Sequence, residues 1–145
     1  MSNSRSALDK LVSYLAIRDH SEQELMRKLA KNYSSDEIFQ AIMFAREHKL
    51  MKTPEELSAQ VYHELSRKNK GYLYIAKYLR AKGLPHHQID REQELEKARK
   101  LVMNKLHIEG AQGSLAHEEK IKIYRLLANR GFDDQTIRTI TYEES

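Results

Sequence analysis

The chain has 145 residues, of which 40% are hydrophobic and 32% are charged, and its formal net charge is +4. The absence of cysteine excludes disulfides and thiolate zinc sites, and no apolar run is long enough to span a membrane. Two prolines and five glycines favour an all-α protein, in which each helix buries one apolar stripe. We therefore expect a cytoplasmic protein, and the mild positive charge favours anionic partners.

The first third of the sequence predicts three helices, at about 6–18, 21–31 and 35–48. Two of them begin with a capping box, in which a serine hydroxyl accepts from the third helical amide and a glutamate accepts from the serine amide. These boxes pair Ser21 with Glu24 and Ser34 with Glu37. Asn32 follows a basic residue, where a left-handed C-cap is expected.

The middle third predicts helices at about 54–68, 71–82 and 86–90, the last of them short. Thr53 and Glu56 form a third capping box, with Pro54 at the first helical position. Gly83 follows a basic residue and is the expected C-cap of the second helix.

The last third predicts helices at about 91–107, 115–130 and 134–142, with Gly131 as a C-cap. Between the first two of these helices, the segment Glu109–Gly113 has the composition of a flexible joint.

A short pattern occurs three times, with about fifty residues between copies, a spacing typical of stacked repeats. Each copy begins with two apolar residues four positions apart, with a cation midway between them. A basic residue followed by Gly or Asn comes next, and an isoleucine lies six residues after that Gly or Asn. The copies begin at Leu25, Ile75 and Ile123. They predict three tandem three-helix repeats over residues 1–52, 53–90 and 91–145, stacked in one continuous array.

The central cation of each copy lies on the predicted outward face: Arg27, Lys77 and Arg125. The segment Leu65–Ile89 contains no acidic residue, and tyrosines alternate with its cations. Cations neutralise phosphates and aromatic rings stack on bases, so this segment is the best candidate for contact with nucleic acid or an acidic protein surface. A solvated helix face remains the alternative. The predicted binding residues are Arg27, Arg67, Lys68, Lys70, Leu73, Tyr74, Lys77, Arg80, Lys82 and Arg125.

The motifs of catalysis are missing from the sequence. It contains neither of the glycine-rich loops that cradle phosphates, and its seven histidines do not have the spacing of a metal site. We therefore predict a protein that is not an enzyme and that has no cofactor or metal.

Several segments resemble the RecX regulators of RecA, over about residues 7 to 142. The first is Arg18–Leu25 with Lys28–Leu29. The middle segment has Gly71, Ile75, Leu79 and Lys82–Gly83, and the last has Tyr124–Leu127, Arg130–Phe132 and Ile137. Each motif is weak alone, but their order and spacing together are specific.

The resemblance implies three tandem three-helix units in an elongated curved array, in agreement with the repeats. It also implies a protein, expected to be monomeric, that binds RecA in the groove of the RecA–ssDNA filament. There it would inhibit or modulate the ATPase, strand exchange and co-protease activities of RecA in recombination and the SOS response.

Two other functions remain open from the residues alone. One is a helical DNA-binding regulator that acts on single- or double-stranded DNA independently of RecA, through the surface between Arg67 and Lys82. The other is a scaffold or dimerisation module.

Overall fold

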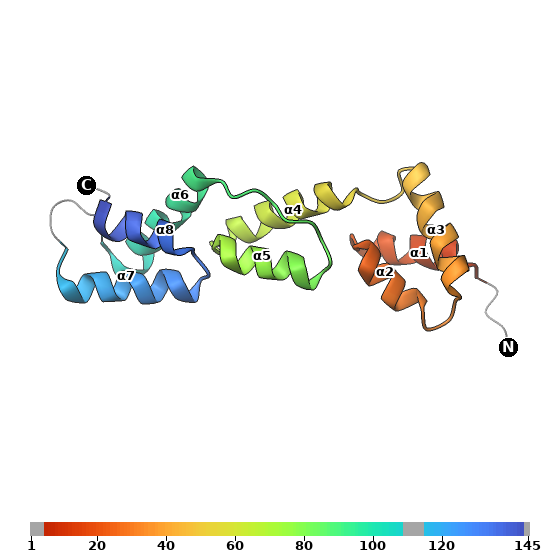
Figure 1. The fold of residues 1–145 in the computed structure, drawn as a ribbon, viewed down its shortest axis with the longest axis horizontal. Helices are drawn as coiled ribbons and strands as arrows, with labels where there is room; N and C mark the ends of the chain where they lie inside the picture. The colour runs from red at the N-terminus through yellow and green to blue at the C-terminus, as the bar shows by residue number, and fades with distance from the viewer. Residues whose placement is uncertain (1–4, 109–114, 144–145) are drawn as a thin grey trace. The chain divides into compact units, whose positions relative to one another are not determined.

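The computed structural model describes residues 5–108 and 115–143, which form helices and loops without a β-strand (Figure 1). The all-α prediction is therefore confirmed. The predicted joint at Glu109–Gly113 lies outside the described residues.

The described residues divide into two compact units, each assembled from two stretches of the chain. The first unit comprises the described part of Met1–Gln60 together with Leu79–His86. The second comprises Val61–Tyr78 and the described part of His87–Ser145. The division into three repeats stays a prediction.

Three helices supply most of the first unit: α1 (Ala7–Ile17), α2 (Glu22–Leu29) and α3 (Ser35–Glu47) (Figure 1). Both predicted capping boxes are present, at the N-terminal ends of α2 and α3. The helices pack around one hydrophobic core, because apolar residues recur at helical spacing on the inner face of each. Its buried residues are Ala7, Leu11, Leu25, Leu29, Ile38, Ala41, Ile42 and Ala45.

The next two helices, α4 (Pro54–Arg67) and α5 (Tyr72–Ala81), each contribute residues to both units. Pro54 is the first residue of α4, and Thr53 and Glu56 form the predicted capping box. Tyr62 and Ile75 are buried in the second unit, and Leu57 and Leu79 are buried in the first.

The second unit continues with α6 (Arg91–Leu101), α7 (His117–Asn129) and α8 (Asp134–Arg138). Both α6 and α8 run on into a π-helical segment, at Val102–Leu106 and Thr139–Glu143. A second hydrophobic core joins these elements. Its buried residues are Ala98, Leu101, Val102, Ile123, Leu127, Phe132, Ile137 and Ile140.

The predicted helix at 86–90 is wrong, because this segment is an irregular connection to α6. Carbonyl groups of this connection, which covers residues 84–90, accept hydrogen bonds from side chains of other helices. In the first unit the Ser58 hydroxyl donates to the Pro85 carbonyl (2.7 Å), and in the second the Tyr72 hydroxyl donates to the His87 carbonyl (2.6 Å). Asp90 then caps α6 by accepting from the Gln93 amide.

Two of the three predicted left-handed C-caps are confirmed. Gly83 (φ +71°) ends α5 and Gly131 (φ +85°) ends the turn after α7. Asn32 does not adopt a positive φ, so that prediction is wrong. Helix α2 ends earlier, and the amides of Asn32 and Tyr33 both donate to the Leu29 carbonyl in a right-handed turn.

A buried carboxylate, Glu24, ties α2 to the segment after α5 within the first unit. It accepts from the Ser21 amide (3.1 Å) and pairs with Arg18 (2.9 Å) and Lys82 (3.4 Å). Burial alone raises the pKa of Glu24, but the hydrogen bonds from Arg18 and Ser21 and the charge of Lys82 outweigh it and lower the pKa to about 2.

This pKa predicts that acid weakens the first unit through Glu24. The pKa in the folded protein lies below the ordinary value of 4.5, so the stabilisation is complete above that value and is lost as the pH falls toward 2. Urea unfolding at about pH 6 and about pH 3 should show a smaller acid-induced loss of stability for Glu24→Gln than for the unsubstituted protein. The exposed control Glu55→Gln should behave like the unsubstituted protein, and an identical loss in all three would contradict the assignment.

Candidate partner-binding surface

Helix α5 displays one buried face and one exposed face, as its apolar spacing predicts. Ile75 and Leu79 are buried, and Tyr72 and Ala76 are half-buried. The opposite face has two large apolar side chains in solvent, since Leu73 is 52% exposed and Tyr74 is 41% exposed. Solvent-exposed apolar and aromatic side chains beside cations are typical of a binding surface.

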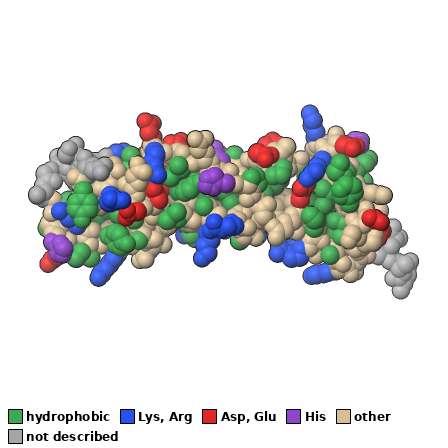
Figure 2. Space-filling model, in the orientation of Figure 1, with side chains coloured by type: hydrophobic (Ala, Val, Ile, Leu, Met, Phe, Trp, Pro, Cys, Tyr) green, Lys and Arg blue, Asp and Glu red, His purple; other side chains and the backbone are tan. Residues whose placement is uncertain are grey.

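The cations of this segment differ in their surroundings. Lys77 and Arg80 are exposed on α5, and Lys and Arg side chains gather over this helix in Figure 2. The Lys70 ammonium lies 4.8 Å from the centre of the Tyr74 ring, a cation–π contact that holds both side chains near the start of α5.

Two of the three cations that directly precede α5 lie at the C-terminal end of α4. Arg67 and Lys68 are exposed there, where the helix dipole favours positive charge. Asn69 adopts a left-handed conformation (φ +59°) directly after them and ends the turn. The backbone thus presents both side chains to solvent.

The structure divides the predicted binding residues between the two units. Three belong to the first unit: Arg27 and Arg80, which are exposed, and Lys82, which is half-buried in its ion pair with Glu24. Seven belong to the second: Arg67, Lys68, Lys70, Leu73, Tyr74, Lys77 and Arg125. Their role in binding stays a prediction.

The start of α5 is fixed by a buried carboxylate from α6, which sequence reasoning missed. Glu94 is 0% exposed, accepts from the Tyr72 amide (2.8 Å) and accepts from the Tyr62 hydroxyl (2.8 Å). It therefore caps α5 from a different helix and sets the direction in which the exposed face of α5 points.

A buried lysine completes this polar cluster. Lys97 is 6% exposed, and its ammonium lies 2.5 Å from Glu94. It also donates to the Ser66 hydroxyl (3.0 Å) and the Lys70 carbonyl (2.9 Å). Burial lowers the pKa of Lys97 against the opposing effect of Glu94, and burial with Glu94 raises the pKa of Tyr62.

Exposed apolar side chains on α7 extend the set of candidates. Tyr124, which sequence reasoning missed, is 56% exposed, and Ile121 is 38% exposed. Ile121 occupies the position in its repeat that Leu73 occupies in the middle repeat. That correspondence was the available signal for an exposed apolar face here.

The described residues contain no cluster of histidines and carboxylates that could hold a metal ion. Among the same residues, no helix is both long and apolar enough to cross a membrane. The exposed groups of the candidate surface are cations and aromatic rings, which can bind phosphates, bases or carboxylates.

Comparison with known proteins gives consistent matches. A family profile described as "RecX, first three-helix domain" matches residues 7–44. The regulatory protein RecX of Prosthecochloris aestuarii is 31% identical, with 94% of this chain and 92% of that protein covered. The RecX of Chlorobaculum tepidum is 35% identical, with coverages of 92% and 84%.

Two solved structures share the fold. The crystal structure of RecX from Lactobacillus salivarius has a TM-score of 0.75 at 20% identity and covers 92% of this chain and 91% of that one. A crystal structure of regulatory protein RecX has a TM-score of 0.74 at 19% identity, with coverages of 92% and 70%.

Proposed function

Because the chain belongs to the RecX family of regulatory proteins, we propose that it is a non-enzymatic regulator that binds RecA and the RecA filament on DNA. The match to RecX regulators along nearly the whole chain carries this proposal. In the proposed role the protein lodges in the filament groove and inhibits or modulates RecA ATPase, strand exchange and co-protease activity in recombination and the SOS response.

The exposed face of α5 supports a partner of this kind. A RecA filament on DNA offers phosphates, bases and acidic side chains together. The cations Lys77 and Arg80 suit the phosphates and carboxylates, while Leu73 and Tyr74 supply apolar area for a protein or base contact. Binding through such a surface needs no catalytic group.

The direct test measures ATP hydrolysis by RecA on single-stranded DNA while the concentration of this protein is raised. We expect hydrolysis to fall and filaments to shorten in the same concentration range. If hydrolysis and filament length are both unchanged when the protein is present at a molar concentration comparable to that of RecA, the proposed function is refuted.

Charge reversal on α5 tests the surface itself. The double substitution Lys77→Glu with Arg80→Glu should raise the concentration for half-maximal inhibition about tenfold or more, because like charges then face each other. Circular dichroism should show an unchanged helix content, since both side chains are exposed. The matched control, Lys31→Glu with Lys100→Glu, reverses two exposed cations elsewhere and should inhibit normally. Normal inhibition by the α5 variant would remove this surface from the proposal.

The acid-free segment from Leu65 to Ile89 also favours a second candidate, a DNA-binding regulator that acts without RecA. If this function is correct, the protein binds DNA in the absence of RecA, and its affinity for DNA falls steeply as the salt concentration rises. A measurable affinity combined with no effect on RecA hydrolysis would favour it over the first proposal.

A further inference from the structure

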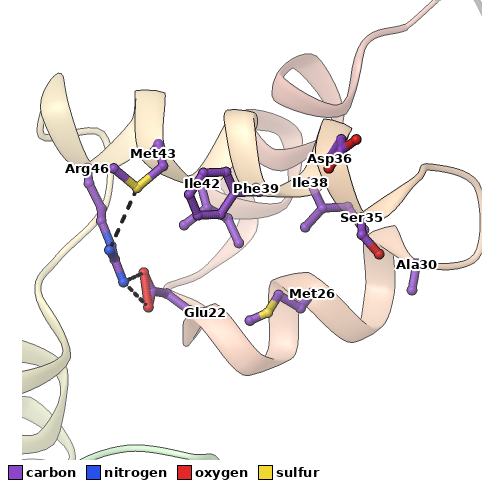
Figure 3. A pocket seen from close by; sticks show the side chains of 10 residues that line it. All are labelled: Glu22, Met26, Ala30, Ser35, Asp36, Ile38, Phe39, Ile42, Met43 and Arg46. Carbon is purple, nitrogen blue, oxygen red and sulfur yellow. Dashed lines mark hydrogen bonds and ion pairs between the residues drawn. The ribbon is translucent and has the colours of Figure 1, made fainter.

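The first unit contains an apolar groove whose lining includes none of the predicted binding residues. It runs between α2 and α3 and has a volume of about 590 Å³ (Figure 3). Its apolar lining comprises Met26, Ala30, Ile38, Phe39, Ile42 and Met43. Figure 2 shows hydrophobic side chains gathered over the same two helices.

The groove has a fixed floor and adaptable walls. Ile38 and Ile42 form the floor and belong to the buried core of the unit, so they cannot move independently. Phe39 is 64% exposed and Met26 is 47% exposed, so large apolar surfaces stand in solvent on either side. Thioether side chains are flexible and polarisable, which suits a wall that closes on an apolar ligand.

The two ends of the groove differ in charge. At one end Glu22 and Arg46 form an ion pair across the groove, as Figure 3 shows, and neutralise each other. Asp36 lines the groove at the first turn of α3, toward the other end, and its carboxylate makes no ion pair with any described residue. The groove thus presents one carboxylate without an ion-pair partner beside an apolar trough.

The dimensions indicate the kind of segment that fits. From Asp36 to Arg46 the α3 backbone rises about 15 Å, which equals about three turns of a partner helix. A helix of that length places apolar side chains at i, i+4 and i+7 on one face, the pattern by which amphipathic helices enter grooves.

We propose that this groove binds one amphipathic helix of a protein partner, with apolar side chains against Phe39, Met26 and Met43 and a lysine or arginine beside Asp36. The charge complementarity favours a basic residue at the Asp36 end, because the carboxylate at the other end, Glu22, is already paired with Arg46. This binding site shares no residue with the α5 surface and does not depend on RecA.

The test uses methionine methyl groups as local probes in the full-length protein. Methyl-labelled methionine gives separate NMR signals for Met26 and Met43 in the groove and for Met51 and Met103 outside its lining. The probe is a helix-stabilised synthetic peptide of about four turns, with leucines at i, i+4 and i+7 and lysines at one end. We expect saturable shifts of Met26 and Met43, while Met51 and Met103 stay in place.

Matched peptides and variants separate this result from non-specific binding. Replacing the leucines by serine should abolish the shifts, and replacing the lysines by glutamate should weaken binding about fivefold or more. In the protein, Phe39→Ser should weaken binding about tenfold, because an apolar wall is lost. Ile17→Ser changes an even more exposed apolar residue, on α1, and should have no effect.

Three results would overturn the proposal. The first is equal shifts at Met26, Met43, Met51 and Met103, and the second is unchanged binding by Phe39→Ser. The third is a shift of Met26 and Met43 on simple dilution of the protein without peptide, which would mean that a second copy of the chain fills the groove.

Discussion

Replacing Glu94 by alanine is expected to destabilise the protein by about 3–5 kcal/mol, because the buried Lys97 ammonium loses its counter-charge. The Tyr62 hydroxyl and the Tyr72 amide lose their acceptor at the same time. Urea unfolding followed by circular dichroism measures the effect.

The control is Glu96→Ala, which removes an exposed carboxylate from the same helix and should change stability by about 0.5 kcal/mol or less. A loss below about 1 kcal/mol for Glu94→Ala would show that the pair is not held in a dry interior. The double variant Glu94→Leu with Lys97→Met should recover part of the loss, since it removes both charges together.

The second large effect is expected at Gly71, where α5 begins. A Cβ atom at this position would lie 2.4 Å from the Gly131 carbonyl carbon and 2.4 Å from the Phe132 nitrogen. These are backbone atoms, which cannot avoid the clash by rotating as a flexible side chain could. Gly71→Ala must therefore separate the start of α5 from the turn between α7 and α8.

That separation also breaks two backbone hydrogen bonds, from Gly71 to the Arg130 carbonyl (2.8 Å) and from Leu73 to the Gly131 carbonyl (2.8 Å). We expect a loss of about 3 kcal/mol or more from overpacking and the lost bonds together. Thermal or urea unfolding measures it, with the exposed neighbour Lys68→Ala as a control of small effect. Equal stability of the two variants would show that the close approach is absent in solution.

Sequence reasoning succeeded where the determining contacts are local. The boxes at Ser21, Ser34 and Thr53 each join residues three apart, so the sequence contains every participant. The helix predicted at 86–90 is absent, and the carbonyl groups of Pro85 and His87 instead accept from Ser58 and Tyr72, which lie far away in the chain. Hydrogen bonds to residues that are distant in the sequence cannot be inferred from a local sequence pattern.

The buried pair was missed for a different reason, because charged residues usually lie at the surface. A signal was nevertheless present in the sequence. Glu94, Lys97, Ala98 and Leu101 follow the spacing of one helical face, so two charges share a stripe with apolar residues. The exposure of the predicted cations on α5 follows from helical spacing, whereas the groove between α2 and α3 required the packing of two helices.

The contact at Gly71 has a consequence for the order of folding during synthesis. The start of α5 leaves the ribosome well before the turn at Gly131 that receives it. Domains form as their segments become available, so the second unit cannot close until the residues up to Gly131 have been made. The core of α1, α2 and α3 needs only early residues, and it can therefore form while the later helices are still being translated.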